Sequence, residues 1–236
     1  MKNYDELQAA VMDGDIDKTL ALLKKSPKDI HAQGGIILSL AANNLAMIKF
    51  LLTSPDFLSK AKLQNGGQEA FEKSCSYGNV EVAQYLLESL SQHAVPNCYI
   101  GAIKACDQGK VNIMQLLADK INLRFRNDCL LKIAAFSGSV ELVDFLVKSG
   151  LKNVDLTSAR NYQVANYLLN LNPELTKETF MMLSAGIQEQ ILINNQFDIN
   201  EPDMPRNLEP LIKMLREKEQ LSGTLDVTRN TKVVKL

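Results

Sequence analysis

The side chains that could carry out chemistry are few, and their spacing does not suggest a catalytic site. The chain has two histidines, His31 and His93, and neither stands in a recognisable order with a nucleophile and a carboxylate. Gly66-Gly67 lacks the flanking Lys-Ser/Thr of a phosphate-binding loop. The paired carboxylates Glu217 and Glu219 are typical of a solvated helix face. We therefore expect no enzyme, no cofactor, no bound metal and no small-molecule substrate.

The four cysteines favour a structural role. Cys75 and Cys106 each stand three residues before a glycine, in a slot that Ala135 occupies in a third segment. A free cysteine is a small hydrophobic residue that is often buried, so we expect both to fill the space between packed helices. Cys98 and Cys129 lie near connecting segments, where they could be exposed. No Cys-x-x-Cys pair and no Cys/His metal spacing is present, and reduced thiols indicate a cytoplasmic location.

The elements that position these residues repeat along the chain. Five segments each place a turn residue eight positions before a leucine, and a small-residue pair precedes most of the turns. The turn residues stand at 14, 43, 78, 109 and 138, so the intervals are 29, 35, 31 and 29 residues. A period of this size is typical of stacked structural repeats.

The turn residues predict a left-handed backbone at each of the five positions. Four are glycines, which adopt this conformation without steric penalty. The fifth is Asn43, and asparagine tolerates the left-handed region better than most other residues. We therefore expect Asn43 to substitute for glycine in its turn.

Helical periodicity follows each turn. After Gly78, Val82, Ala83 and Leu86 recur at helical spacing, with Glu81 and Gln84 between them. The segment after Gly138 repeats the same pattern. Apolar residues also stand seven positions before each turn. Each repeat is thus predicted to be a helix, a tight turn and a second helix.

The pattern resembles the ankyrin repeat over roughly residues 3 to 200. The resemblance is carried by the helix-Gly-helix cores and by connecting segments at 29–33, 121–124 and 198–200. The family's Thr-Pro-Leu-His opening, which joins adjacent repeats by hydrogen bonds, is missing from every repeat; Cys129-Leu130-Leu131-Lys132 stands in its place in one of them. The resemblance implies an all-α, ankyrin-like helix-turn-helix solenoid of about six to seven repeats with a C-terminal capping helix.

The later repeats are degenerate. Residues 164–169 copy the second helix of the third repeat, but the expected turn at Arg160 comes only 22 residues after Gly138, so a shortened first helix is expected. A seventh repeat over 178–195 is expected to break at Ala185-Gly186. We predict a repeat solenoid over 1–205, a capping helix over 206–223 and a polar, flexible tail over 224–236.

Composition limits the kinds of partner. The chain has 26 basic and 27 acidic residues among 236. This balance argues against broad nucleic-acid binding, which needs a basic stripe. The first twenty residues do not read as a secretory signal. The most apolar stretch, 36–52, contains Asn43, Asn44 and Lys49 and is too polar to span a membrane.

The resemblance implies binding of another protein through the concave face of the solenoid. In that family the face is built from the connecting fingers and the two residues before each turn, which here include Met12 and Asp13, Ala41 and Ala42, and Ser76. The candidate partner-binding residues are Tyr77, Tyr99, Asp107, Gln108, Arg124, Phe125, Arg126 and Phe136. A packing role between repeats is the alternative for Phe125 and Phe136.

A second hypothesis is a sequestering inhibitor or a translocated bacterial effector that occludes an enzyme. It is motivated by a resemblance to divergent ankyrin-like chains of intracellular bacteria and giant viruses, which also lack the Thr-Pro-Leu-His opening. The terminal Val233-Val234-Lys235-Leu236 loosely resembles a translocation tail.

Overall fold

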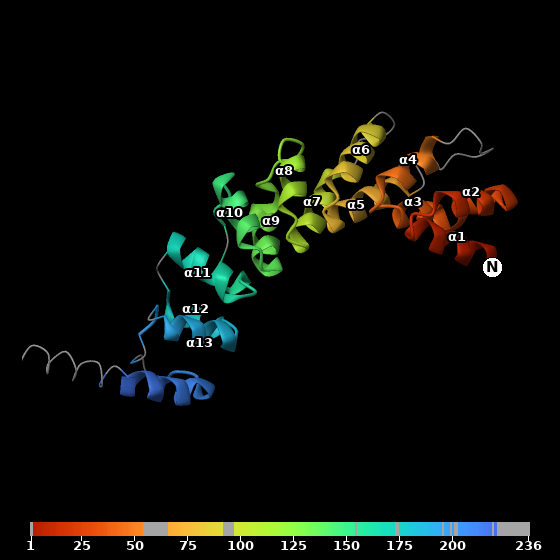
Figure 1. Cartoon of the computed structure of the whole chain (residues 1–236). Coiled ribbons are helices and arrows are strands. Elements are labelled where there is room, and N and C mark those ends of the chain that lie inside the picture. The colour runs from red at the N-terminus through yellow and green to blue at the C-terminus, as the bar shows by residue number, and fades with distance from the viewer. Residues whose placement is uncertain are drawn as a thin grey trace, which may run out of the picture. The chain divides into compact units, whose positions relative to one another are not determined.

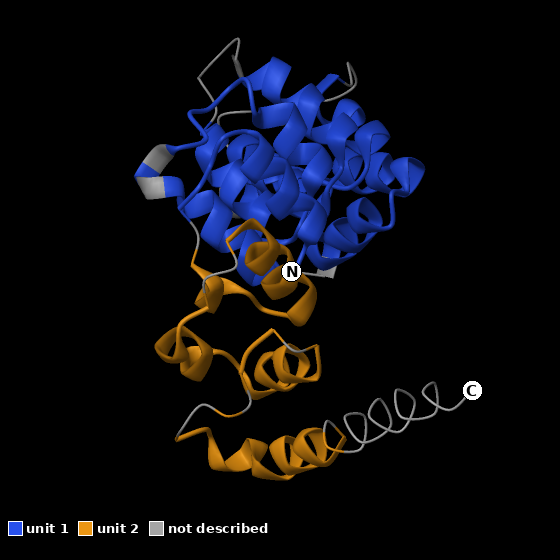
Figure 2. Ribbon diagram, turned by 90° about the vertical axis from the view of Figure 1, so that its left-hand side faces the viewer, with its two compact units in different colours: residues 1–153 blue, residues 154–236 orange. Residues whose placement is uncertain are grey.

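The computed structural model describes residues 2–53, 66–91, 97–153, 155–172, 175–194, 196–198, 200, 203–218 and 220. These residues form helices and connections, with no strand among them, so the all-α prediction is confirmed (Figure 1). The chain divides into two compact units, residues 1–153 and 154–236 (Figure 2). The continuous solenoid over 1–205 stays a prediction, and the tail over 224–236 lies outside the described residues.

The first unit is a series of helical hairpins. Its helices are α1 (Lys2–Met12), α2 (Ile16–Lys25), α3 (Ile36–Leu40), α4 (Leu45–Thr53), α5 (Gly67–Tyr77), α6 (Val80–Ser91), α7 (Cys98–Asp107), α8 (Val111–Leu117), α9 (Phe125–Ser137) and α10 (Val140–Lys148). A 3₁₀ helix, η1 (Pro27–Gly35), precedes α3.

The hairpins stack in order. The first helices α1, α3, α5, α7 and α9 pack successively on one another, and the second helices α4, α6, α8 and α10 form a parallel series (Figure 1). The core lies between the two rows and is built mainly from Ala, Leu, Val and Ile side chains that are excluded from solvent. We call α1, α3, α5, α7 and α9 the first-helix row.

The glycine turns have the predicted left-handed backbone. Gly14, Gly78, Gly109 and Gly138 all have positive φ angles. In three of the hairpins the residue after the glycine donates a backbone hydrogen bond to the carbonyl five positions earlier, at 2.8–3.0 Å. This bond closes the helix end and requires the left-handed residue before it.

Asn43 does not take the left-handed conformation, so the prediction for this turn is wrong. Helix α3 ends at Leu40, earlier relative to its turn than the other first helices. The Asn44 N–H then donates to the Ala41 carbonyl, three residues earlier, at 2.8 Å. A turn closed in this way uses right-handed backbone, which any residue can adopt.

In four of the five hairpins the residue after the turn caps the second helix, and only Lys110, before α8, makes no side-chain cap. The side chains of Asp15, Asn44, Asn79 and Ser139 accept a hydrogen bond from the backbone N–H three residues later. Such caps stabilise a helix start by about 0.5–2 kcal/mol. The turn is therefore fixed by two adjacent residues, one for the end of the first helix and one for the start of the second.

Several residues are helical where the family resemblance implied the extended connections called fingers. Residues 29–33, including His31, lie inside the 3₁₀ helix η1. Tyr99 is the second residue of α7, and Phe125 and Arg126 form the first turn of α9. Pro27 at the first position of η1 presets the backbone angle that a helix start needs.

Side-chain hydrogen bonds join consecutive hairpins in place of the missing Thr-Pro-Leu-His motif. Gln68 on α5 accepts from the Asn97 N–H at 3.1 Å, just before α7. The Tyr99 hydroxyl accepts from the Asn122 N–H at 3.0 Å, before α9. Each bond links a first helix to the connection that leads to the next one.

The last hairpin of the first unit holds the end of that unit by the same means. The Arg124 guanidinium donates to the Gly150 carbonyl at 2.9 Å. Asp128 is buried, and its carboxylate accepts from the N–H groups of Lys152 and Asn153 at 3.0 and 3.1 Å. Asp128 has a φ of 59°, a conformation that Asp tolerates better than most residues.

The second unit contains η2 (Leu156–Ser158), α11 (Tyr162–Leu171), α12 (Lys177–Met182), α13 (Ala185–Ile193) and η3 (Arg206–Leu208), followed by helical residues 209–218. The single turn η2 stands where a shortened first helix was predicted. The expected break at Ala185-Gly186 is displaced, because Leu183 and Ser184 separate the helices and Ala185 begins α13.

One core holds the second unit together. Phe180, Ile187, Ile191 and Leu192 pack with Leu208 of η3 and with Ile212 and Leu215 of the last helix. Phe180 also stacks on Phe197, with ring centroids 4.3 Å apart. The buried Gln188 donates to the Phe180 carbonyl at 2.8 Å, which satisfies its amide inside the core. Residues 209–218 are helical, and a capping helix over 206–223 stays a prediction.

Candidate functional site

The ends of the first helices expose large side chains at the predicted positions. Met12, Tyr77 and Phe136 lie one or two residues before their turns and are 66%, 54% and 63% exposed. The equivalent residues of the second hairpin, Ala41 and Ala42, are buried. We call Met12, Tyr77, Asp107, Gln108 and Phe136 the helix-end row.

Polar side chains occupy the same place at the end of α7. Asp107 ends the helix and Gln108 caps it, and both are exposed. The Gln108 amide donates to the Asp107 carboxylate at 2.8 Å. Asp107 keeps further acceptor capacity, since a carboxylate has about four lone-pair sites. The row therefore combines apolar and hydrogen-bonding groups.

Tyr99 and Arg124 use their polar atoms within the first unit. The Tyr99 hydroxyl bonds to the backbone of Asn122, and the Arg124 guanidinium bonds to the Gly150 carbonyl. Each bond joins two hairpins, a role that sequence reasoning missed because the bonded residues are 23 and 26 positions apart. A contribution of either side chain to partner binding stays a prediction.

Phe125 and Arg126 lie at the start of α9. Arg126 is exposed and has a φ of 50°. The Phe125 side chain lies outside the described part of the structure, so both its packing role between repeats and its role in partner binding stay predictions. Asp107, Gln108, Tyr77 and Phe136 are thus the predicted residues that the structure places at the ends of the first-helix row.

Sequence reasoning missed two further exposed apolar groups. Ile100 and Ile103 lie three residues apart on α7 and are partly exposed. Met181 and Met182 end α12 of the second unit, at the same hairpin position as Tyr77 and Phe136. The displaced break at 183–184 hid this equivalence, because the expected turn was two residues later.

The buried cysteines are unsuited to nucleophilic chemistry. Cys75 and Cys106 are fully buried, as predicted, and Cys98 and Cys129 are half-buried. Burial raises the pKa of both Cys75 and Cys106 from the ordinary 9.0 to about 12. Burial also raises the pKa of the Cys98 thiol. The thiolate is the reactive form, so these three thiols are protonated at neutral pH.

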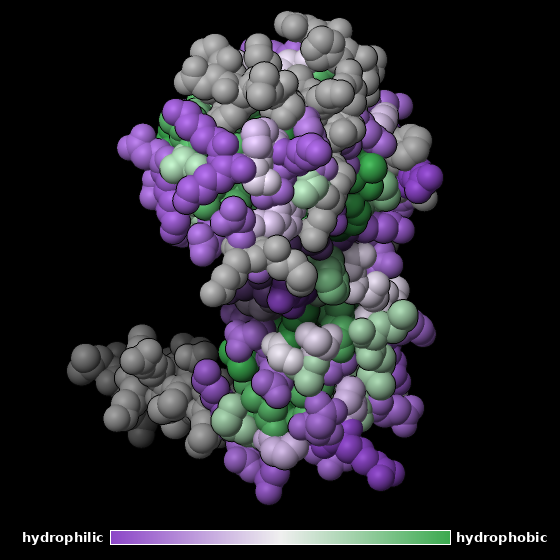
Figure 3. Space-filling view, turned by 90° about the vertical axis from the view of Figure 1, so that its right-hand side faces the viewer, coloured by the Kyte–Doolittle hydropathy of each residue, from purple (hydrophilic) through white to green (hydrophobic). Residues whose placement is uncertain are grey.

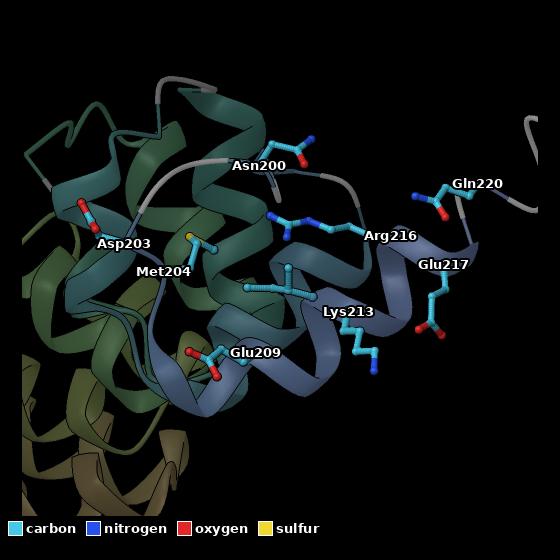
Figure 4. A pocket seen from close by; sticks show the side chains of 9 residues that line it. Asn200, Asp203, Met204, Glu209, Lys213, Arg216, Glu217 and Gln220 are labelled. Atoms are coloured by element: carbon cyan, nitrogen blue, oxygen red, sulfur yellow. The ribbon is translucent and has the colours of Figure 1, made fainter.

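A hollow of about 710 Å³ with a mixed polar and apolar lining lies beside the last helix of the second unit (Figure 4). In the figure the Arg216 side chain reaches back toward Asn200, while Lys213 and Glu217 project outward. Glu209 and Asp203 complete a lining of mixed charge. Asp203 is already paired with Lys177 at 3.6 Å. The lining favours no particular ligand charge, and we assign it no ligand.

The chain matches no protein-family model and no curated protein sequence. Within the described residues no three His, Cys, Asp or Glu side chains gather so that they could hold a metal ion. None of the helices described is long and apolar enough to cross a membrane.

Proposed function

We propose that this chain is a protein-binding module, an ankyrin-like solenoid of six to seven hairpins that holds a partner protein on its helix-end row and that performs no catalysis. Stacked hairpins bury one face of each helix against the next hairpin and leave their ends for recognition. The ordered packing of the first helices in the first unit supports this proposal.

The observation that carries the proposal is the recurrence of exposed large side chains one or two residues before the turn in three of the five hairpins of the first unit. Met12, Tyr77 and Phe136 stand where a small polar residue would fold as well, because none of them is buried in the core. Exposed apolar groups that recur in register mark an interaction surface better than scattered ones do. Tyrosine in particular is enriched among residues that dominate binding energy.

The test compares capture of partner proteins from a cytoplasmic extract by the intact chain and by its variants. The Tyr77→Ser, Phe136→Ser double variant removes both aromatic anchors, and the Met214→Ser variant removes an equally exposed apolar residue of the second unit. Loss of a central aromatic anchor weakens binding by roughly 2–4 kcal/mol. We expect the double variant to lose a partner that the intact chain and Met214→Ser both retain.

Folding must stay intact for this comparison to hold. Both aromatic side chains are more than half exposed, so their removal should leave the melting temperature nearly unchanged. If the double variant keeps every partner of the intact chain, the helix-end row is not the binding surface. Where the captured partner is an enzyme, an assay of its activity separates the two alternatives, because a sequestering inhibitor lowers that activity and an adaptor does not.

A further inference from the structure

The second unit exposes apolar side chains at the end of α12 and along one side of α13. Met182 is 72% exposed, more than any other large apolar side chain in the described part of the chain, and Met181 beside it is exposed as well. Ile193 at the end of α13 is also exposed. We call Met181, Met182, Ala185, Gly186, Glu189 and Ile193 the methionine face.

The spacing of these residues places them together. Ala185, Glu189 and Ile193 are four residues apart, so they lie along one side of α13. The opposite side carries Ile187 and Ile191, which are buried in the core. Met181 and Met182 precede this stripe by only a two-residue connection. Figure 3 shows hydrophobic residues gathered on the part of the surface that belongs to the second unit.

Gly186 has no role in the fold that would require glycine. Its backbone is not left-handed, and a Cβ built on it would meet nothing within 4 Å. Gly101 on α7 differs, because a Cβ there would lie 2.8 Å from the Phe71 ring. Glycine is among the poorest helix formers. A glycine that neither the backbone conformation nor the packing of this fold requires is suited to a place where another backbone approaches closely.

The segment that carries this face has charged residues of one sign. From Glu178 to Asp198 the sequence contains three carboxylates, Glu189 among them, and no Lys, Arg or His. Lys177, just before this stretch, lies 3.6 Å from the Asp203 carboxylate. An apolar face whose own charged side chain is Glu189 is complementary to a partner that is apolar and basic.

We propose that the methionine face binds a basic amphipathic helix of a partner protein. The apolar side of that helix lies on Met181, Met182 and Ile193, and the open space over Gly186, which has no side chain, lets its backbone come close. A lysine or arginine of the partner pairs with Glu189. Methionine suits this task, because its flexible thioether adapts to differently shaped apolar side chains. Helices that dock into an apolar groove in this way are a recurring recognition mode.

The experiment uses the intact chain and two labelled model peptides of about 18 residues, long enough to form a helix on binding. One peptide is built from Leu and Lys, and the other has Glu in place of every Lys with the same apolar positions. Fluorescence anisotropy measures both affinities. We expect the Leu/Lys peptide to bind at least about tenfold more tightly than the Leu/Glu peptide.

Three variants test the face itself. Glu189→Lys reverses its charge, Gly186→Lys fills the notch with a cation, and Met182→Ser removes an apolar contact. Each should weaken binding of the Leu/Lys peptide by about tenfold or more. Glu81→Lys, on the exposed side of α6 in the first unit, is the matched control with the same change in net charge. It should bind like the intact chain.

The folding control is built into the choice of residues. A side chain at position 186 meets open space, so Gly186→Lys should melt no lower than the intact chain. Equal weakening by Glu81→Lys and Glu189→Lys would reduce the effect to bulk charge and overturn the proposal. So would equal binding of the Leu/Glu peptide, or no binding of either peptide. If the intact chain instead self-associates in sedimentation and Gly186→Lys makes it monomeric, a second copy covers the face and the proposal is wrong.

Discussion

Replacing Gly101 by alanine should destabilise the first unit, although alanine is the better helix former. A Cβ at this position of α7 would lie 2.8 Å from the Phe71 ring and 3.0 Å from the Cys75 sulfur. Both neighbours are fully buried, so neither can move into solvent. Carbon atoms at optimal contact are about 3.5–4.0 Å apart, so α5 and α7 must separate or repack.

The magnitude follows from two opposing effects. Adding a methylene-sized group to a packed core costs typically about 1–3 kcal/mol. The higher helix propensity of alanine returns up to about 1 kcal/mol. We therefore expect a net loss of about 1 kcal/mol, with a range from about zero to 3 kcal/mol, in the free energy of unfolding.

The matched control is the same substitution at Gly186, where a Cβ meets nothing within 4 Å. Here only the propensity gain remains, so Gly186→Ala should leave the second unit as stable or stabilise it by up to about 1 kcal/mol. Urea unfolding followed by circular dichroism measures both changes. Combining Gly101→Ala with Cys75→Ala should cost less than the sum of the two, because the second change removes the sulfur that the new methyl meets. If Gly101→Ala stabilises the chain as Gly186→Ala does, α5 and α7 do not pack as closely as described.

Three further experiments test the turns, the thiols and the end of the first unit. Gly109→Val forces a β-branched residue to a φ of 65° and should cost about 1–3 kcal/mol of stability. Glu81→Ala, on the exposed side of α6, should not change the melting temperature, and equal melting temperatures for the two variants would show that the turn is wrongly assigned. Cys75 and Cys106 should resist a thiol reagent until the chain unfolds, and rapid labelling of the folded chain would contradict their burial. Because burial raises the pKa of both thiols from 9.0 to about 12, the unfolded chain releases these protons first, so stability should fall as the pH rises from about 9 toward 12 and should fall less in a Cys75→Ala, Cys106→Ala chain. Asp128→Ala should lose two charge-assisted hydrogen bonds and strain its left-handed backbone, whereas Asp128→Asn should lose less stability. Amide hydrogen exchange at Lys152 and Asn153 should speed up most in the alanine variant. Equal protection in the intact chain and in both variants would refute the role of the carboxylate.

The hairpins could be predicted from sequence because their signals are local. A left-handed glycine, a capping residue after it and a helical apolar pattern all lie within one repeat, and Gly78 with Asn79 shows all three. Asn43 has the same local signals, yet its turn is closed by a different hydrogen bond because α3 ends early. The length of α3 depends on the 3₁₀ helix before it and on packing against α1 and α5, which no pattern within the repeat reports.

The bonds between hairpins could not be predicted, because they join residues 23 to 29 positions apart without a shared motif. Gln68 with Asn97 and Tyr99 with Asn122 each join a first helix to the connection before the next one by a hydrogen bond between a side chain and a backbone N–H. The family resemblance places Tyr99 on a fingertip of the binding face, and tyrosine is a typical hot-spot residue. The structure shows that its hydroxyl is engaged within the first unit.

Glycines give the clearest case of what must be seen in three dimensions. Gly109 is needed for its left-handed backbone, and Gly101 is needed because two packed side chains leave no room for a methyl group. Gly186 satisfies neither condition, although its sequence setting in a helix is like that of Gly101. Backbone conformation accounts for Gly109 and packing accounts for Gly101, whereas neither accounts for Gly186. Near it stand the most exposed methionine of the described chain and a stretch of sequence without a positive charge, and these neighbours are the reason that we propose an apolar, basic partner for this face.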